Sequence, residues 1–184
     1  MKIGSITSCL DHAGARFKED GVVVVTTDPI CVIGVCDATS IPYDAETPAI
    51  LVPDEAGDET GTGEMVKSIF CRTLPDTQTE DLLTVIMEID SRIQKFNREC
   101  QEKHGLPVEA AFSAGLGCTV LKIDSKKTEI FQCGDCIAVL RKTDRTIGYT
   151  ENPVKAASTR DREIKARLLK ECHQDAYAAR VKFT

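Results

Sequence analysis

The sequence has no long apolar run and no excess of positive charge, and we expect no secretory leader. No stretch approaches the ~20 apolar residues that span a bilayer, and the segment 1–4 lacks the apolar core of a signal peptide. The net charge is −6, so no basic stripe is available to neutralise phosphates or anionic lipids. We therefore expect a cytoplasmic protein with neither nucleic-acid nor membrane partners. The oligomeric state is left open.

The sequence also lacks two common catalytic patterns. None of its three histidines accompanies a serine or cysteine in a nucleophile motif, which argues against triad chemistry. Cys133 and Cys136 form the only Cys-x-x-Cys, and no second pair has the spacing of a structural zinc site. A thioredoxin-like role would require this pair at a helix N-terminus, whereas it falls within a strand pattern.

Cysteine itself is abundant, but its pattern does not indicate disulfides. The count of nine is odd. Most of these residues occupy apolar positions of expected strands or helices, where a reduced thiol behaves as a small hydrophobe. These are Cys31, Cys36, Cys71, Cys100 and Cys118. The pattern predicts reduced, structural thiols.

Length and periodicity indicate one α+β domain over residues 1–184. With 42% hydrophobic residues the chain can bury one sizeable core, and strands, helices and a meander suggest the α+β class. We expect strands over 2–9 and 21–37 and a three-strand meander within 120–140. A long irregular insertion is expected over 42–63. The expected helices are one from Gly61 closed by Pro75, a longer one from about Thr79 to His104 and a charged one over 160–173.

Asp37 ends the apolar run 30–36 and is followed at once by small and polar residues. A charge at the end of a buried strand is costly unless a cation, hydrogen bonds or water compensate it, so the position suggests a divalent metal site or a satisfied turn. Glu19 and Asp20 precede a second strand-like run, and a turn signal at 27–29 predicts a hairpin that brings both acidic ends together. Carboxylates suit Mg²⁺ and Mn²⁺. The alternative is solvated edge charge.

Three segments occur in a familiar order. The loop 14–20 carries an arginine ahead of an acidic pair, the strand end 35–39 carries an aspartate, and the segment 131–140 contains a Gly-Asp turn. Together they resemble the metal-dependent type 2C protein serine/threonine phosphatases, whose corresponding segments bind phosphate and metal. The segment 61–70 is similar to the helix start that follows the Asp-Gly loop of that family. The resemblance covers roughly residues 3–150.

This resemblance implies a two-sheet antiparallel β-sandwich flanked by helices, in the αββα arrangement, with two Mg²⁺ or Mn²⁺ ions at one end. Asp37 would bridge the ions. Ala38 would replace the usual glycine that supplies a main-chain carbonyl. Glu19 or Asp20 would hold a metal through water or orient its ligands, and Asp135 would match an acidic residue that helps hold a third metal in some members.

The implied activity is hydrolysis of phosphoserine or phosphothreonine in a phosphoprotein by a metal-activated water, without a phosphoenzyme. Arg16 would bind two phosphate oxygens through its planar fork. It lies one residue closer to the acidic pair than is common in the family.

The family's two later metal aspartates have no counterpart after Leu140. We therefore expect a fragment, a shortened member or an inactive relative. An inactive relative would act as a regulatory module that binds a protein partner through the 42–63 loop or the terminal helix.

Overall fold

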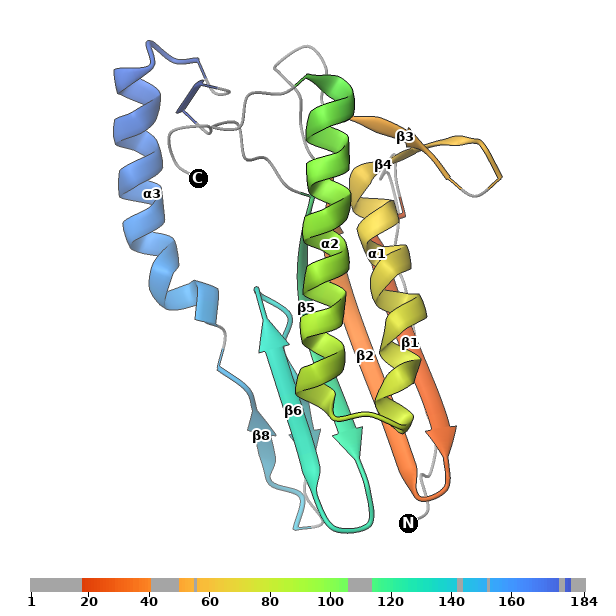
Figure 1. Ribbon diagram of the computed structural model, residues 1–184. Helices are drawn as coiled ribbons and strands as arrows, with labels where there is room; N and C mark the ends of the chain where they lie inside the picture. The colour runs from red at the N-terminus through yellow and green to blue at the C-terminus, as the bar shows by residue number, and fades with distance from the viewer. Residues whose placement is uncertain are drawn as a thin grey trace.

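The structure is a computed structural model. It describes residues 18–40, 50–54, 56–105, 114–141, 144–151, 153–175 and 178–179. Its centre is a four-stranded antiparallel sheet in the order β1-β2-β5-β6 (Figure 1). The strands of this sheet are β1 (Asp20–Thr27), β2 (Ile30–Thr39), β5 (Gly115–Ile123) and β6 (Thr128–Cys133). The α+β class expected from the sequence is confirmed.

The other elements are two hairpins and the helices. β3 (Leu51–Pro53) pairs with β4 (Glu59–Gly61), and β7 (Val139–Arg141) pairs with β8 (Ile147–Tyr149). The helices are α1 (Thr62–Thr73), the 3₁₀ helix η1 (Leu74–Gln78), α2 (Leu82–His104) and α3 (Pro153–Glu171). No helix among the described residues combines the length and apolar character needed to cross a membrane.

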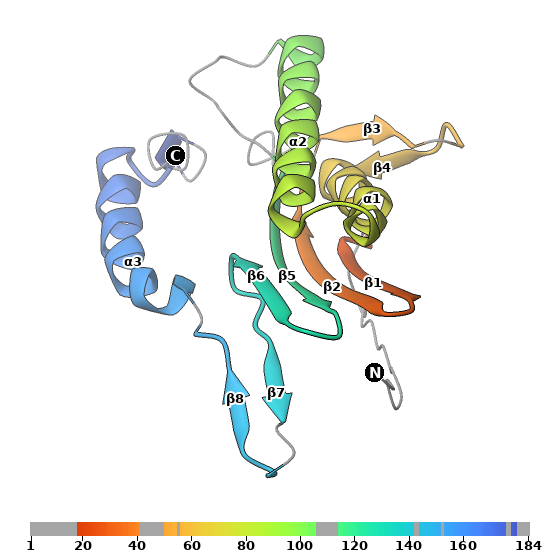
Figure 2. The ribbon, with the colours of Figure 1, turned by 60° about the horizontal axis from the view of Figure 1, so that its bottom comes forward.

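The hairpin of β1 and β2 turns at Asp28 and Pro29, as the sequence predicts. Its register places Asp20 directly opposite Asp37, so the expected meeting of the acidic ends is confirmed. Side chains alternate between the two faces of a strand, and directly opposed residues share a face. We call the face covered by α1, η1 and α2 the inner face, and the opposite one the outer face (Figure 2).

The core lies between the inner face and the helices. Val32, Phe70 and Leu74 are fully buried there. Phe70 and Leu74 press on Gly34 of β2, where an added Cβ would lie 3.1 Å from Cζ of Phe70 and would overlap Cδ2 of Leu74. The absence of a side chain at Gly34 therefore allows α1 and η1 to approach the sheet closely.

Both long helical stretches begin or end differently from the expectation. α1 ends at Thr73 rather than Pro75, because the chain tightens into η1 with the proline in its first turn. α2 begins at Leu82 rather than Thr79, because the Asp81 side chain caps it by accepting a hydrogen bond of 3.2 Å from the N–H of Thr84. Its C-terminus was predicted correctly: Gly105 ends the helix in the left-handed conformation, at φ 62°.

Three other expectations need correction. The insertion over 42–63 is not irregular throughout, because its described part contains the β3–β4 hairpin with Ile50 and Val52 buried. The third meander strand runs over Val139–Arg141 and pairs with β8, not with β6. α3 begins at Pro153 instead of 160 and stands apart from the four-stranded sheet in Figures 1 and 2. The strand expected over 2–9 lies outside the described residues.

Candidate metal site

The acidic end of the outer face gathers Asp20, Asp37 and Asp135. Asp20 and Asp37 are cross-strand partners, and the β5 partner of Asp37 is Gly117, which has no side chain. Oδ1 of Asp135 lies 3.3 Å from the position that a Cβ on Gly117 would take. The gap at Gly117 thus admits the Asp135 carboxylate beside the first two. We call these three residues the acidic end.

The turn after β6 delivers Asp135 to this position. Gly134 has a φ of 75°, which L side chains rarely adopt, and a Cβ on it would lie 2.8 Å from the Gly117 Cα. The following segment is fastened to the outer face, because Oγ1 of the buried Thr119 donates a hydrogen bond of 2.8 Å to the Cys136 carbonyl. Two glycines in backbone contact therefore set the approach of Asp135.

Asp37 lies in a negative environment. Partial burial raises the pKa of the Asp37 carboxyl first, and the carboxylates of Asp20, Asp135 and Glu19 raise that pKa further. The charged groups that shift it are all of one sign. A bound cation would remove this repulsion, and oxygen ligands suit Mg²⁺ or Mn²⁺. The chemistry of the donors therefore fits a hard divalent cation.

Glu19 is held separately, at the start of α1. Its side chain accepts a hydrogen bond from Oγ of Ser40, and that oxygen accepts a bond of 3.1 Å from the N–H of Gly63. The Glu19 carbonyl also accepts from the N–H of Ala38, at 3.4 Å. The negative side chain thus lies where the helix dipole favours it. Sequence reasoning missed Ser40, because one serine after a strand carries no distinctive signal.

Ala38 lies within β2, opposite Leu116, with its side chain in a second core cluster beside Ile50 and Val66. Its exposed fraction is 2%. Ala38 is not among the described non-glycine residues that have a positive φ. Alanine therefore needs no glycine-like backbone here and enters this position without strain. The metal role of its carbonyl stays a prediction.

The ligand set also stays a prediction. Among the residues that the structure describes, no three histidine, cysteine, aspartate or glutamate side chains are grouped closely enough to hold a metal ion. Asp20 and Asp135 are close enough to raise the pKa of Asp37, but the three carboxylates do not form such a group. Arg16, expected to bind phosphate, lies outside the described residues.

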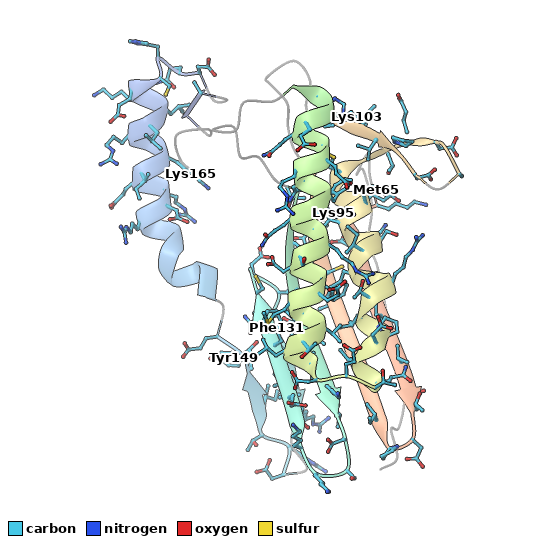
Figure 3. The ribbon with its side chains drawn as sticks, viewed as in Figure 1. Met65, Lys95, Lys103, Phe131, Tyr149 and Lys165 are labelled. Atoms are coloured by element: carbon cyan, nitrogen blue, oxygen red, sulfur yellow. The ribbon has the colours of Figure 1, made fainter. Side chains whose placement is uncertain are left out.

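A groove of about 650 Å³ lies on the other side of the sheet, between α2 and the strands β5 and β6. Phe131 of β6 is one of its walls (Figure 3). Leu83 and Met87 of α2 also line it and are more than half exposed. None of the predicted site residues borders this groove, so it is separate from the acidic end.

Comparison of the chain with protein-family models, curated proteins and solved structures finds no match.

Proposed function

We propose that this chain is a domain of the type 2C kind that binds Mg²⁺ or Mn²⁺ at the acidic end and hydrolyses phosphoserine or phosphothreonine monoesters. One observation carries the proposal: Asp20, Asp37 and Asp135 come from β1, β2 and the turn after β6, yet they lie at one end of one sheet face. These are the positions that the resemblance assigns to metal binding.

The described residues provide the attraction for the cation. Asp37 and Asp20 offer carboxylate oxygens from paired strands, and Asp135 adds a third from the turn. A divalent cation held there supplies Lewis-acid chemistry, lowering the pKa of a water molecule and shielding phosphate charge. Glu19, fixed by Ser40, contributes to the negative potential from the N-terminus of α1. This arrangement requires no cysteine or serine nucleophile.

We also propose the two-sheet β-sandwich that the resemblance implies. The outer face is apolar beyond its acidic end, with Val24 and Ile130 exposed by 38% and 39%. The chain after β6 crosses to this face, where Gln132 donates a hydrogen bond of 2.7 Å to the Glu151 carbonyl. This bond and the bond from Thr119 to the Cys136 carbonyl join the segments that flank the β7–β8 hairpin to the outer face. We propose that a second sheet covers the face, with this hairpin as part of it.

A second candidate is a non-catalytic relative that binds a protein. It is favoured by the lack of a closed ligand group among the described residues. Such a domain would keep the acidic end as a weak single site or lose cation binding altogether. The two candidates differ in what Mn²⁺ does, and calorimetry separates them.

The test is titration of the chain with Mn²⁺, followed by an assay of p-nitrophenyl phosphate hydrolysis across a range of Mn²⁺ concentrations. We expect weak binding, and we expect Asp37→Asn to reduce the affinity by at least about tenfold, because outer-shell substitutions alone cost 10–100-fold. Asp90→Asn is the matched control: it removes a carboxylate from α2, away from the acidic end.

Equal Mn²⁺ affinity in the wild type and Asp37→Asn would refute the metal site. Hydrolysis that depends on both Mn²⁺ and Asp37 would support the phosphatase. Binding that depends on Asp37 without hydrolysis would favour the non-catalytic relative, with its site retained.

A further inference from the structure

The inner face carries a row of thiols. Cys36, Cys118 and Cys133 are successive cross-strand partners on β2, β5 and β6, so their side chains share one face of the sheet. Cys36 and Cys118 are each 4% exposed, while Cys133 is exposed at the end of its strand. The eight cysteines in the described part of the chain are free thiols.

A fourth thiol meets this row from the helix layer. Cys71 of α1 and Cys36 of β2 converge above Gly21, the cross-strand partner of Cys36. A Cβ on Gly21 would lie 2.8 Å from Sγ of Cys36, 3.1 Å from Sγ of Cys71 and 3.0 Å from Cγ of Lys67. The two sulfurs and the lysine stem therefore occupy the space that a side chain at Gly21 would fill.

The surroundings of Cys71 favour its thiolate form. A hydrogen bond from Cys36 lowers the pKa of Cys71 to about 7; burial opposes this shift and the nearby Lys67 ammonium supports it. Cys36 lies beside Cys71 above Gly21 and is 4% exposed. The pair thus combines a nucleophilic thiolate with a neighbouring thiol that can resolve its oxidation product.

We propose that Cys71 and Cys36 are a peroxide-reactive pair that closes to a disulfide between α1 and β2. This modification site is independent of the proposed phosphatase activity. Its oxidant is hydrogen peroxide or an alkyl hydroperoxide, and a small thiol reductant reverses it.

The reaction balances in two steps. The Cys71 thiolate attacks one peroxide oxygen and the O–O bond breaks, so sulfur becomes a sulfenic acid and the leaving hydroxide takes up a proton to form water. The Cys36 sulfur then attacks the Cys71 sulfur, the S–O bond breaks, and a second water leaves with the Cys36 proton. Two thiols and one hydrogen peroxide give one disulfide and two waters.

The neighbouring cysteines do not compete for this reaction. Cys31 lies on the same strand but alternates to the outer face, where it is fully buried. Burial raises the pKa of Cys118 to about 12, which keeps it a thiol at neutral pH. Cys100 packs in the second core cluster beside Val66 and Ala114.

The test uses the full chain treated with hydrogen peroxide and then unfolded in denaturant. We expect the count of reactive thiols to fall from nine to seven and to recover with dithiothreitol. The sequence has no lysine or arginine between residues 19 and 66. Trypsin therefore releases Cys36 in peptide 19–67 and Cys71 in the short peptide Ser68–Arg72. Mass spectrometry should find these two peptides joined.

Matched variants identify the partner. Peptide 19–67 also contains Cys31, so Cys31→Ser should keep the joined peptide, whereas Cys36→Ser and Cys71→Ser should each abolish it. Circular dichroism checks the folding of each variant, and the wild-type peptide map decides the matter where a variant fails to fold.

Three results would overturn the proposal. One is an unjoined Ser68–Arg72 peptide after peroxide treatment, with its thiol intact or over-oxidised. Another is a disulfide that uses Cys31. The third is a covalent dimer through the exposed Cys133 as the main product.

Discussion

Cys36 and Asp37 are neighbours in β2, yet they belong to two different chemical surroundings. Cys36 points to the inner face, 4% exposed, among other thiols and the helix layer. Asp37 points to the outer face, exposed and among other carboxylates. About 3.4 Å of strand separates the two environments. One strand thus carries residues of both proposed sites, and the alternation of its side chains places them on opposite faces of the sheet.

The comparison shows that the neighbouring groups, and not burial alone, determine the direction in which a pKa shifts. Burial raises the pKa of Asp37 and opposes the lowering of the pKa of Cys71. The Asp37 carboxyl meets like charges, which add to the effect of burial. The Cys71 thiolate meets a hydrogen-bond donor and a lysine, which outweigh it.

The largest expected effect contrasts the two faces through a matched pair of valines. Val32 is fully buried on the inner face, while Val24 is 38% exposed on the outer face. We expect Val32→Ala to lower the free energy of unfolding by about 2–3 kcal/mol and Val24→Ala by less than about 1 kcal/mol. Urea denaturation measures both. Equal losses would mean that the outer face is as firmly covered as the inner one.

A smaller effect is expected where the acidic end is assembled. Gly134→Ala forces a side chain into a backbone with φ 75° and against the Gly117 Cα. We expect it to lower the free energy of unfolding by about 1–2 kcal/mol, and to weaken Mn²⁺ binding because Asp135 moves. Gly148→Ala is the control, since a Cβ there meets nothing within 4 Å. Indistinguishable denaturation curves for the two variants would contradict the assigned turn.

The smallest effect concerns the charge of Asp37. The pKa of Asp37 in the folded chain lies above the usual 3.8. Between the usual pKa and the folded-state pKa, the folded state binds more protons than the unfolded state, so the free energy of unfolding falls as pH rises. Without metal, Asp37→Asn should therefore stabilise the chain near neutral pH by less than about 1 kcal/mol, because solvent screens an exposed group. The gain should vanish below the usual pKa. Thermal unfolding in EDTA measures it, and a loss of stability at neutral pH would contradict the like-charge environment.

The part of the acidic end that depends on local sequence could be predicted. The turn signal at 27–29 and the apolar runs on either side fix the hairpin register, and this register alone brings Asp20 opposite Asp37. The position of Asp135 could not be predicted from local sequence alone. Its position depends on Gly117 being the β5 partner of Asp37 and on the contact of Gly134 with Gly117. Such pairings between distant segments leave no periodic trace in the sequence.

The same limit explains the errors in the fold. The apolar residues of β7 predict a third meander strand, because periodicity identifies a strand but not its partner. The cap that starts α2 at Leu82 depends on the hydrogen bond that the Asp81 side chain accepts from the N–H of Thr84, which competes with the helical pattern upstream. The meeting of Cys71 with Cys36 is a tertiary contact between helix and sheet, and neither residue stands out from the other apolar cysteines of the sequence.

Gly34 determines how closely the helix layer approaches the sheet. Phe70 and Leu74 rest on its bare Cα, and the next residue after Phe70 is Cys71. A methyl group added at Gly34 would clash with Phe70 and Leu74 and would move α1 and η1 away from β2. The sulfur of Cys71 would part from that of Cys36, whereas Asp37, on the opposite face, would keep its cross-strand neighbours. The absence of a side chain at Gly34 therefore affects the separation of the two thiols but not the cross-strand pairing of Asp37.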